Sequence, residues 1–331
     1  MAISLPALAR SRGIIKPRAV ETTGVYTSVD ALVGLEAMAR DLAFLRKAPV
    51  RRLLAGRHES RMRGRGLSFE ELRNYLPGDD IRAIDWRVTA RTGKPVVRVY
   101  DEEKDRPALI LVDQRINMFF GSRRAMKSVA AAEVAALSAW RVLALGDRVG
   151  GFVFGDEEVT EVRPYRSREA VIRFADSIVR HNTALQARSQ APHGAEQLDV
   201  VLTTVANIAR HDHLVIVISD FDGYSLETRD MLLKLSAHND VISVLIYDPF
   251  LLELPRKGDI VFSGGLLQAE VQFGHGDVRE AIDSFARKRG RALRAWQEEL
   301  GLPMLPISAA EEVAPQLRTM LGQLASRQRR R

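Results

Sequence analysis

A series of short apolar runs, alternating with helix-length segments after Pro107, limits the fold more than any other feature of this chain. Runs that are apolar on both sides are typical of strands buried on both faces, as in a parallel sheet sandwiched between helices. The sequence therefore predicts an α/β three-layer sandwich with a mostly parallel sheet over residues 107–324. Its strands are expected at 108–112, 148–154, 214–218, 241–246 and 304–308, and its main helices at 123–145, 168–181, 195–210, 227–238 and 311–324.

The rest of the chain divides into further segments with other patterns. Residues 25–106 are expected to form an N-terminal helix and a small β-containing domain, with a helical turn at Phe69–Arg73 and an extended run at Val96–Tyr100. The remaining segments are a flexible arm at 1–24, an insertion at about 249–275 with a hairpin at 260–273, a basic helix at 278–300 and a basic tail at 325–331.

Composition excludes several classes of protein. With no cysteine among 331 residues, the chain has no disulfide framework, thiolate metal site or cysteine nucleophile. No apolar run reaches the roughly 18 residues of a membrane helix, and the N-terminus does not resemble a signal peptide. We therefore expect a soluble cytoplasmic protein without membrane insertion.

The net charge of +7 is concentrated in Arg-rich stretches at 51–65 and 327–331. Such stretches attract polyanions, so nucleic acid is one candidate partner. A solvated helix surface and a tail without a partner explain the same charges.

Three of the predicted strands end in an aspartate: Asp113, Asp220 and Asp248. Ligands of open parallel sheets bind at the carboxyl ends of the strands, so these carboxylates could converge on a divalent cation. Each of them could instead cap the next helix or turn.

The first of these strands, its long crossover helix and the later Ile218-Ser219-Asp220 resemble von Willebrand factor A (vWA) domains, whose metal site has the pattern Asp-x-Ser-x-Ser. Here Arg115 and Asn117 replace both serines, and the family's later threonine is missing. Asp113 and Asp220 match the pattern. We expect no cofactor, with Mg²⁺ or Mn²⁺ at Asp113 and Asp220 as the alternative. Because a guanidinium cannot bind a metal, Arg115 is expected to pair with Asp113 or Asp220 in place of the ion.

A second resemblance lies in the segment that begins Arg73-Asn74-Tyr75-Leu76-Pro77-Gly78-Asp79-Asp80 and ends at Trp86, followed by Thr89-Ala90-Arg91. It is similar to the signature of the bacterial family called domain of unknown function 58, which precedes a vWA-like domain. Ile81 and Ile84 are expected to face inward. The charges suggest an interdomain clamp, a docking surface or paired carboxylates for acid/base chemistry, and we favour the clamp. The signature residues are Arg73, Tyr75, Pro77, Gly78, Asp79, Asp80, Arg82, Asp85, Trp86 and Arg91.

The resemblance implies a non-catalytic protein-interaction module. Members of the family are associated with MoxR-type AAA+ ATPases, so the implied role is that of an adaptor or co-chaperone for such an ATPase and its client. Two alternatives stay open: a nucleic-acid-binding protein that uses the Arg-rich stretches, and a metal-dependent hydrolase at Asp113 and Asp220.

Overall fold

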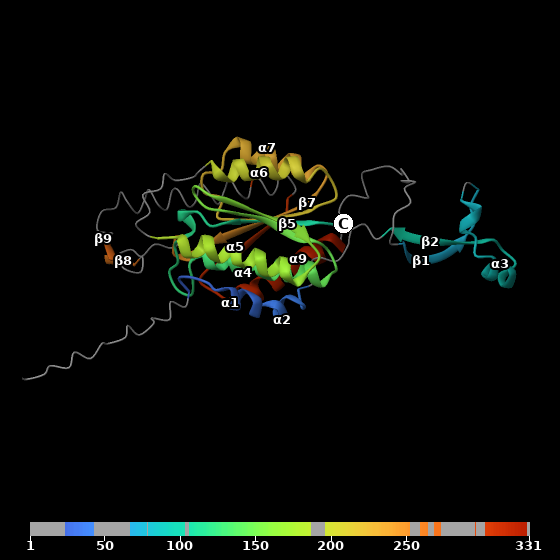
Figure 1. Cartoon of the computed structure of the whole chain (residues 1–331), viewed down its shortest axis with the longest axis horizontal. Helices are drawn as coiled ribbons and strands as arrows, with labels where there is room; N and C mark the ends of the chain where they lie inside the picture. Colours follow the sequence, from blue (N-terminus) through green and yellow to red (C-terminus); the bar gives the residue numbers. More distant parts are fainter. Residues whose placement is uncertain are drawn as a thin grey trace, which may run out of the picture.

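The main unit of the protein is a six-stranded sheet between two helical layers (Figure 1). The strand order is β10-β7-β6-β3-β4-β5, and every neighbouring pair is parallel except β4 and β5. The predicted α/β sandwich is therefore confirmed. The structure is a computed structural model that describes residues 24–42, 67–77, 79–102, 106–186, 196–251, 259–263, 268–272, 295 and 302–329.

The predicted strands of the sheet all form, and burial explains why they could be predicted. Every residue of β3, β4 and β6 is buried, so each strand has a near-continuous apolar sequence. The bounds of the predicted strands are β3 Ala108–Asp113, β4 Val149–Phe154, β6 Leu214–Ser219, β7 Asp240–Tyr247 and β10 Met304–Ser308. The sequence prediction missed β5, Val159–Tyr165, because this antiparallel edge strand alternates exposed and half-buried residues.

Two helical layers cover the sheet, and each has its own apolar core. In Figure 1, α6 (Gln197–Ile208) and α7 (Leu226–Ser236) lie on one face of the sheet. The helices of the other layer are α1 Val29–Gly34, α2 Glu36–Ala39, α4 Lys127–Ala144, α5 Arg168–Ala184 and α9 Val313–Arg329. Most of α4 is buried, and its many alanines allow close packing against both the sheet and the neighbouring helices.

The N-terminal helices α1 and α2 pack in the helical layer that covers the sheet. They are therefore part of the main unit, which corrects the expected grouping of residues 25–106 in one domain. Leu32 is fully buried in the core beneath α4, and Trp140 Nε1 donates a hydrogen bond to its carbonyl oxygen at 3.0 Å. The Thr27 N–H donates to Asn182 Oδ1 at 2.9 Å. These contacts join parts of the chain more than 100 residues apart, which local periodicity cannot show.

The start of α4 also differs from the prediction. The helix predicted from residue 123 begins at Lys127, and the hydroxyl of Ser122 donates to Asp248 Oδ1 at 2.6 Å. α4 ends at Ala144, close to the predicted end at residue 145, and is followed by Gly146, whose φ of +82° places it in the left-handed region that favours glycine.

Residues 67–102 form a separate supersecondary unit, here called the signature unit. β1 (Leu67–Asn74) pairs antiparallel with β2 (Val96–Glu102), and between them lie the 3-10 helix η1 (Ile81–Ala83) and α3 (Trp86–Thr92). The extended run at Val96–Tyr100 is confirmed. The helical turn predicted at Phe69–Arg73 is wrong, because pairing with β2 keeps this segment extended.

The predicted hairpin of the insertion is present as β8 (Asp259–Ser263) paired antiparallel with β9 (Gln268–Gln272). It follows β7 and the short 3-10 helix η3 (Pro249–Leu251). Three predicted segments lie outside the described residues: the arm at 1–24 except Gly24, the Arg-rich stretch at 51–65, and the basic helix at 278–300 except Ala295. Within the described part, no helix has the length and apolarity needed to span a membrane.

Gly151 in the middle of β4 provides a test of how closely the strands pack. A Cβ atom at this position would overlap the backbone of Ile110 in β3. We predict that Gly151→Ala lowers the free energy of unfolding by about 3 kcal/mol, because neither strand can move without disturbing the core. Gly322→Ala is the control: its Cβ would meet open space in α9, so stability should rise by about 0.5–1 kcal/mol. Urea unfolding of both variants measures the difference, and equal midpoints would contradict this packing.

Candidate functional site: the carboxyl edge of the sheet

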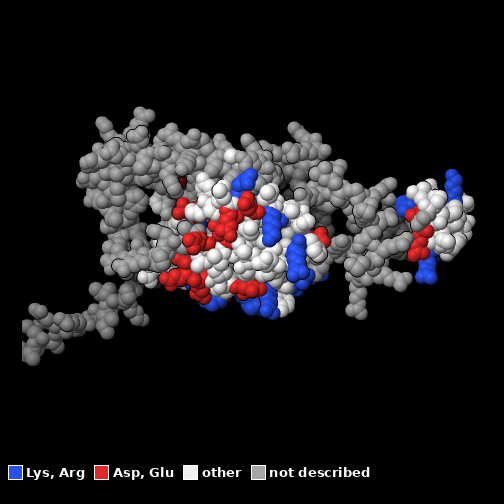
Figure 2. All heavy atoms as spheres, turned by 90° about the horizontal axis from the view of Figure 1, so that it is seen from above, with Lys and Arg blue, Asp and Glu red and all other residues white. Residues whose placement is uncertain are grey.

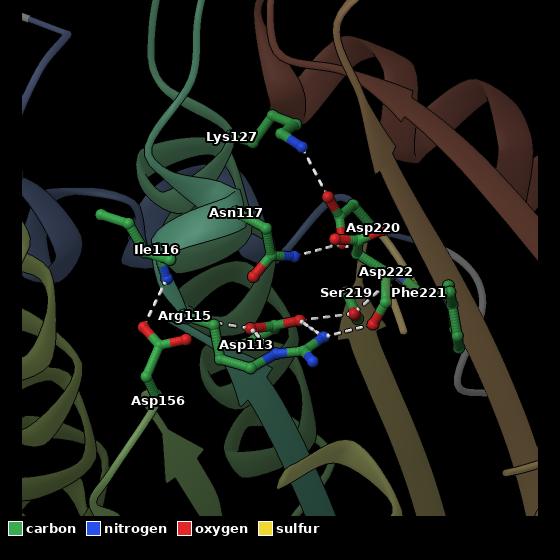
Figure 3. A network of polar contacts seen from close by, with 10 residues as sticks. All are labelled: Asp113, Arg115, Ile116, Asn117, Lys127, Asp156, Ser219, Asp220, Phe221 and Asp222. Atoms are coloured by element: carbon green, nitrogen blue, oxygen red, sulfur yellow. Dashed lines mark hydrogen bonds and ion pairs between the residues drawn. The ribbon is translucent and has the colours of Figure 1, made fainter. Parts of the chain in front are cut away.

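The candidate site lies where β3 and β6 end. β3 connects through α4 to β4 on one side, whereas β6 connects through α7 to β7 on the other. Neighbouring strands whose connections diverge open a crevice at their carboxyl ends, the usual ligand position in such sheets. Asp113 ends β3 and Asp220 directly follows β6, so both carboxylates lie at this crevice (Figure 3).

Asp113 forms a buried ion pair with Arg115, one of its two predicted partners. Arg115 Nη2 lies 2.7 Å from Asp113 Oδ2, and Nε lies 3.0 Å from Oδ1. The Arg115 N–H also donates to Oδ1 at 3.0 Å, and the Ser219 hydroxyl donates to Oδ2 at 2.6 Å. Both oxygens of Asp113 are therefore occupied by donors from this chain.

Arg115 is held on several sides. Its side chain is 2% exposed, its guanidinium carbon lies 5.7 Å from the centroid of the Phe154 ring, and Nη2 donates to the carbonyl oxygen of Asp222 at 3.1 Å. Burial lowers the pKa of the guanidinium, but the charge and hydrogen bonds of Asp113, with smaller effects of Asp220 and Asp222, raise this pKa above its ordinary value. Arg115 is thus a fixed positive charge at this edge.

Asp220 is held in the same manner by a lysine and an amide. Lys127 Nζ lies 2.5 Å from Asp220 Oδ2, and both side chains are 5% exposed. Asn117 Nδ2 donates to Asp220 Oδ1 at 2.7 Å, and the Asp222 N–H donates to the same oxygen at 2.9 Å. Lys127 reaches Asp220 because it is the first residue of α4, which starts at the carboxyl edge.

The turn after β6 has a constrained backbone. Phe221 is fully buried with a φ of +56°, a left-handed conformation that is rare for a bulky residue. Ser219 Oγ accepts a hydrogen bond from the Phe221 N–H at 2.8 Å and donates to Asp113. The hydroxyl therefore joins the turn to the ion pair of Asp113 and Arg115.

Two further aspartates fix the loops around the crevice. Asp156 Oδ2 accepts the Ile116 N–H at 2.7 Å, which holds the loop after β3 (Figure 3). Asp248 is not part of the network of Asp113 and Asp220. It accepts hydrogen bonds from Ser122 N, Ser122 Oγ and the Phe250 N–H. Asp248 therefore connects the end of β7 to the loop before α4. Of the two roles considered for it, a metal ligand or a residue that caps the next turn, these contacts fit the second.

These residues do not fit the metal ion of vWA domains. The four carboxylate oxygens of Asp113 and Asp220 accept hydrogen bonds from Arg115, Asn117, Lys127 and the backbone. A divalent cation would have to displace these donors next to two fixed positive charges. Among the described residues, no group of three or more His, Cys, Asp or Glu side chains is arranged to hold a metal.

The signature residues organise their own unit. Arg73 forms two hydrogen bonds of 2.8 Å with the Asp79 carboxylate, which also accepts the Leu76 N–H at 2.8 Å. The bonds from Arg73 and Leu76 lower the pKa of Asp79 below its ordinary value. Asp80 caps η1 and Asp85 caps α3 through their side chains.

The other signature residues are less confined. Trp86, Pro77, Arg82 and Arg91 are exposed, Tyr75 is half-buried, and Gly78 lies outside the described residues. The inward orientation expected for Ile81 is wrong: its side chain is 61% exposed, because the 3-10 turn presents it to solvent while Ile84 is half-buried. The interdomain clamp and the docking surface both stay predictions, since the contacts described above lie within the unit.

Comparison with known proteins identifies the family. The model of the family "Protein of unknown function DUF58" matches residues 71–292, more than half of the chain. The chain belongs to the DUF58 family. Similar proteins are the uncharacterized protein Rv1480 of Mycobacterium tuberculosis and Mb1516 of Mycobacterium bovis, each 29% identical over 228 residues that cover 69% of both chains.

Two solved structures also resemble this DUF58 chain. One is the conserved hypothetical protein BatB from Bacteroides thetaiotaomicron, with 11% identity, a TM-score of 0.39 and coverage of 67% of this chain and 99% of the other. The second is a von Willebrand factor type A protein from Catenulispora acidiphila, with 11% identity, a TM-score of 0.28 and coverage of 46% and 35%.

Charge is unevenly distributed over the face of the DUF58 sheet domain that carries α6 and α7. Figure 2 shows Asp and Glu side chains gathered toward one end of this face and Lys and Arg toward the other. Glu227 and Asp230 lie near the start of α7, and Lys234 lies in its last turn. The helix macrodipole favours this order of charges, so part of the asymmetry stabilises the helix itself.

Sequence reasoning missed Lys127, Ser219, Phe221 and Asp156 in the DUF58 site. One of them gave a usable signal: Lys127 begins an alanine-rich helix that is buried almost throughout. A cation is unfavourable both in the interior and at a helix N-terminus, so a carboxylate partner could have been expected. Ser219 ends β6 and acts through a side-chain contact with Asp113, whereas Phe221 and Asp156 are positioned by turns whose backbone conformation the sequence does not reveal.

Proposed function

We propose that this DUF58 protein is a non-catalytic protein-interaction module that works as an adaptor or co-chaperone with a MoxR-type AAA+ ATPase in the assembly or activation of other proteins. The observation that carries the proposal is the internal neutralisation of the carboxyl edge by Arg115 and Lys127. Such an edge needs no ion to become ordered, so it offers partners a preformed surface. The ATPase as partner comes from the family resemblance.

The same geometry argues against the hydrolase alternative. A general base must accept a proton from its substrate, and a metal ligand must offer a lone pair. Asp113 and Asp220 are buried and hydrogen-bonded to cations of their own chain. Neither carboxylate is therefore available for these roles without breaking an ion pair.

Affinity purification tests the proposal directly. The tagged full-length chain is incubated with native lysate of its source organism, treated with nuclease and washed at moderate salt, with the tag alone as control. We expect mass spectrometry to find an AAA+ ATPase enriched, and the purified pair to co-elute in gel filtration. In a parallel sample without nuclease, recovery of nucleic acid after the salt wash and without the ATPase would support the alternative partner, since nonspecific binding of nucleic acid falls steeply with salt. Enrichment of no AAA+ ATPase would contradict the proposal.

A further inference from the structure

The signature unit exposes large apolar side chains at an unusual density. The described residues include eleven exposed large hydrophobic residues, and four of them lie within residues 72–86. Trp86 is 65% exposed, Ile81 61%, Leu76 59% and Leu72 43%. Single exposed apolar residues are ordinary on protein surfaces, whereas several together mark an interaction site.

Other contacts hold the signature unit together. β1 pairs with β2 over seven residue pairs, Val96 and Val97 are buried, and the Arg73–Asp79 pair closes the turn after β1. Asp85 caps α3, which ends at Gly93 in the left-handed conformation. Because these contacts leave the side chains of Ile81 and Trp86 largely in solvent, the exposed residues are available to a partner.

Exposed cations lie in the same segment of the chain as these apolar residues. Arg82, Arg87, Arg91 and Lys94 are exposed. Figure 2 shows blue side chains at the margins of the signature unit and red side chains between them. The carboxylates of the same segment have local partners: Asp79 bonds Arg73, Asp80 caps η1 and Asp85 caps α3. The exposed charge next to the apolar residues is therefore mainly positive.

We propose that the signature surface, defined as Leu76, Ile81, Trp86, Arg82, Arg87 and Arg91, docks an acidic amphipathic segment of a protein partner. This inference rests on the proposed function and specifies the chemistry of the partner. Trp and Arg are enriched in the residues that dominate binding energy, and the arginines complement carboxylates with bidentate geometry. Nucleic acid fits less well: a single-strand binder stacks bases on several aromatic rings, whereas two of these three apolar residues are aliphatic.

Titration of the full-length chain with defined peptides tests the surface. The probe is a synthetic helical peptide with Leu at positions i, i+3, i+4 and i+7 and Glu elsewhere, compared with the same peptide carrying Lys for Glu and with oligo-dT. Tryptophan fluorescence in a Trp296→Phe background reports binding, because Trp86 is exposed, Trp140 is buried and Trp296 lies outside the described residues. We expect a saturable blue shift with the Glu peptide and little response to the other two.

Variants show whether the response comes from this surface. Ile81→Ala should weaken binding of the Glu peptide by about tenfold, as expected when a large apolar contact residue of an interface is truncated. Leu226→Ala, at an 80% exposed position on the sheet domain, is the matched control and should leave affinity unchanged. Arg82→Glu with Arg87→Glu should transfer the preference to the Lys peptide. All of these positions are exposed, and circular dichroism checks that each variant folds.

Three results would contradict the proposal that the signature surface docks an acidic amphipathic segment. These are no response to the Glu peptide, a preference for the Lys peptide or oligo-dT, and equal binding by Ile81→Ala and the parent. The proposed function can fail separately. If the lysate yields an AAA+ ATPase equally well with the Arg82→Glu, Arg87→Glu variant, the proposed adaptor role holds, but the proposal that the partner docks on the signature surface is wrong. If the Glu peptide binds as expected but no ATPase is enriched, the signature surface does bind acidic amphipathic segments, but the proposal that the partner is an AAA+ ATPase is wrong.

Discussion

Replacing Arg115 with methionine lowers the free energy of unfolding by about 3–5 kcal/mol, the usual effect of removing one partner of a buried ion pair. Methionine keeps much of the length of the side chain but leaves the Asp113 carboxylate charged and buried. Its remaining donors are the backbone N–H of residue 115 and the hydroxyl of Ser219. Urea denaturation followed by circular dichroism measures this loss.

Two further variants separate the ion pair from general damage. Arg180→Met removes an exposed arginine that pairs with Asp176 one helical turn away, and it should change stability by no more than about 0.5 kcal/mol. Arg115→Met combined with Asp113→Asn removes both charges, so the double variant should be less destabilised than the sum of the single ones. A loss below about 1 kcal/mol for Arg115→Met would mean that the guanidinium does not neutralise Asp113 in solution.

Lys127→Met is the second variant with a large expected effect, again a loss of about 3–5 kcal/mol. Here Asp220 keeps Asn117 Nδ2 and the Asp222 N–H as donors but loses its ion pair with Lys127. Lys234→Met is the matched control, because Lys234 is exposed on α7 and its replacement should fall within about 0.5 kcal/mol.

Thermal unfolding of the Lys127→Met and Lys234→Met variants under identical conditions makes the comparison. Equal midpoints for the two lysine variants would show that Lys127 is hydrated in solution and that the second ion pair of the edge does not form.

The extent to which the sequence predicts this fold follows the burial of each strand. β3, β4 and β6 are buried on both faces, so their composition alone identifies them. β5 is a half-exposed edge strand, and β1 is extended because β2 pairs with it. β2 lies beyond η1 and α3 in the chain, and local pattern carries little information about such pairing. β5 pairs with β4, which directly precedes it, but its alternating exposure leaves it without a continuous apolar run.

The candidate site was predictable to a similar degree. Asp113 and Asp220 could be placed together because the carboxyl ends of adjacent parallel strands meet. Arg115 could be placed near them because it replaces a metal-binding serine of the resembled pattern. The partner of each cation depends on side-chain packing, however, and Lys127 arrives only through the docking of α4 on the sheet.

An edge closed by its own cations behaves differently from a metal-dependent one. A bound ion can be gained or lost with conditions, whereas Arg115 keeps its charge throughout the physiological pH range. We therefore expect partner binding at this edge to be insensitive to chelators. That insensitivity would separate this DUF58 protein from vWA domains that hold partners through a metal ion.

Isothermal titration of the purified chain with Mg²⁺ and with Mn²⁺ tests the central claim most directly, with an Arg115→Ser, Asn117→Ser variant and an Asp113→Asn variant alongside. The account predicts no saturable heat from the parent chain, because Arg115 and Lys127 occupy the carboxylates that a cation would need. Saturable binding by the parent chain that disappears in Asp113→Asn would contradict it and would make Asp113 a metal ligand.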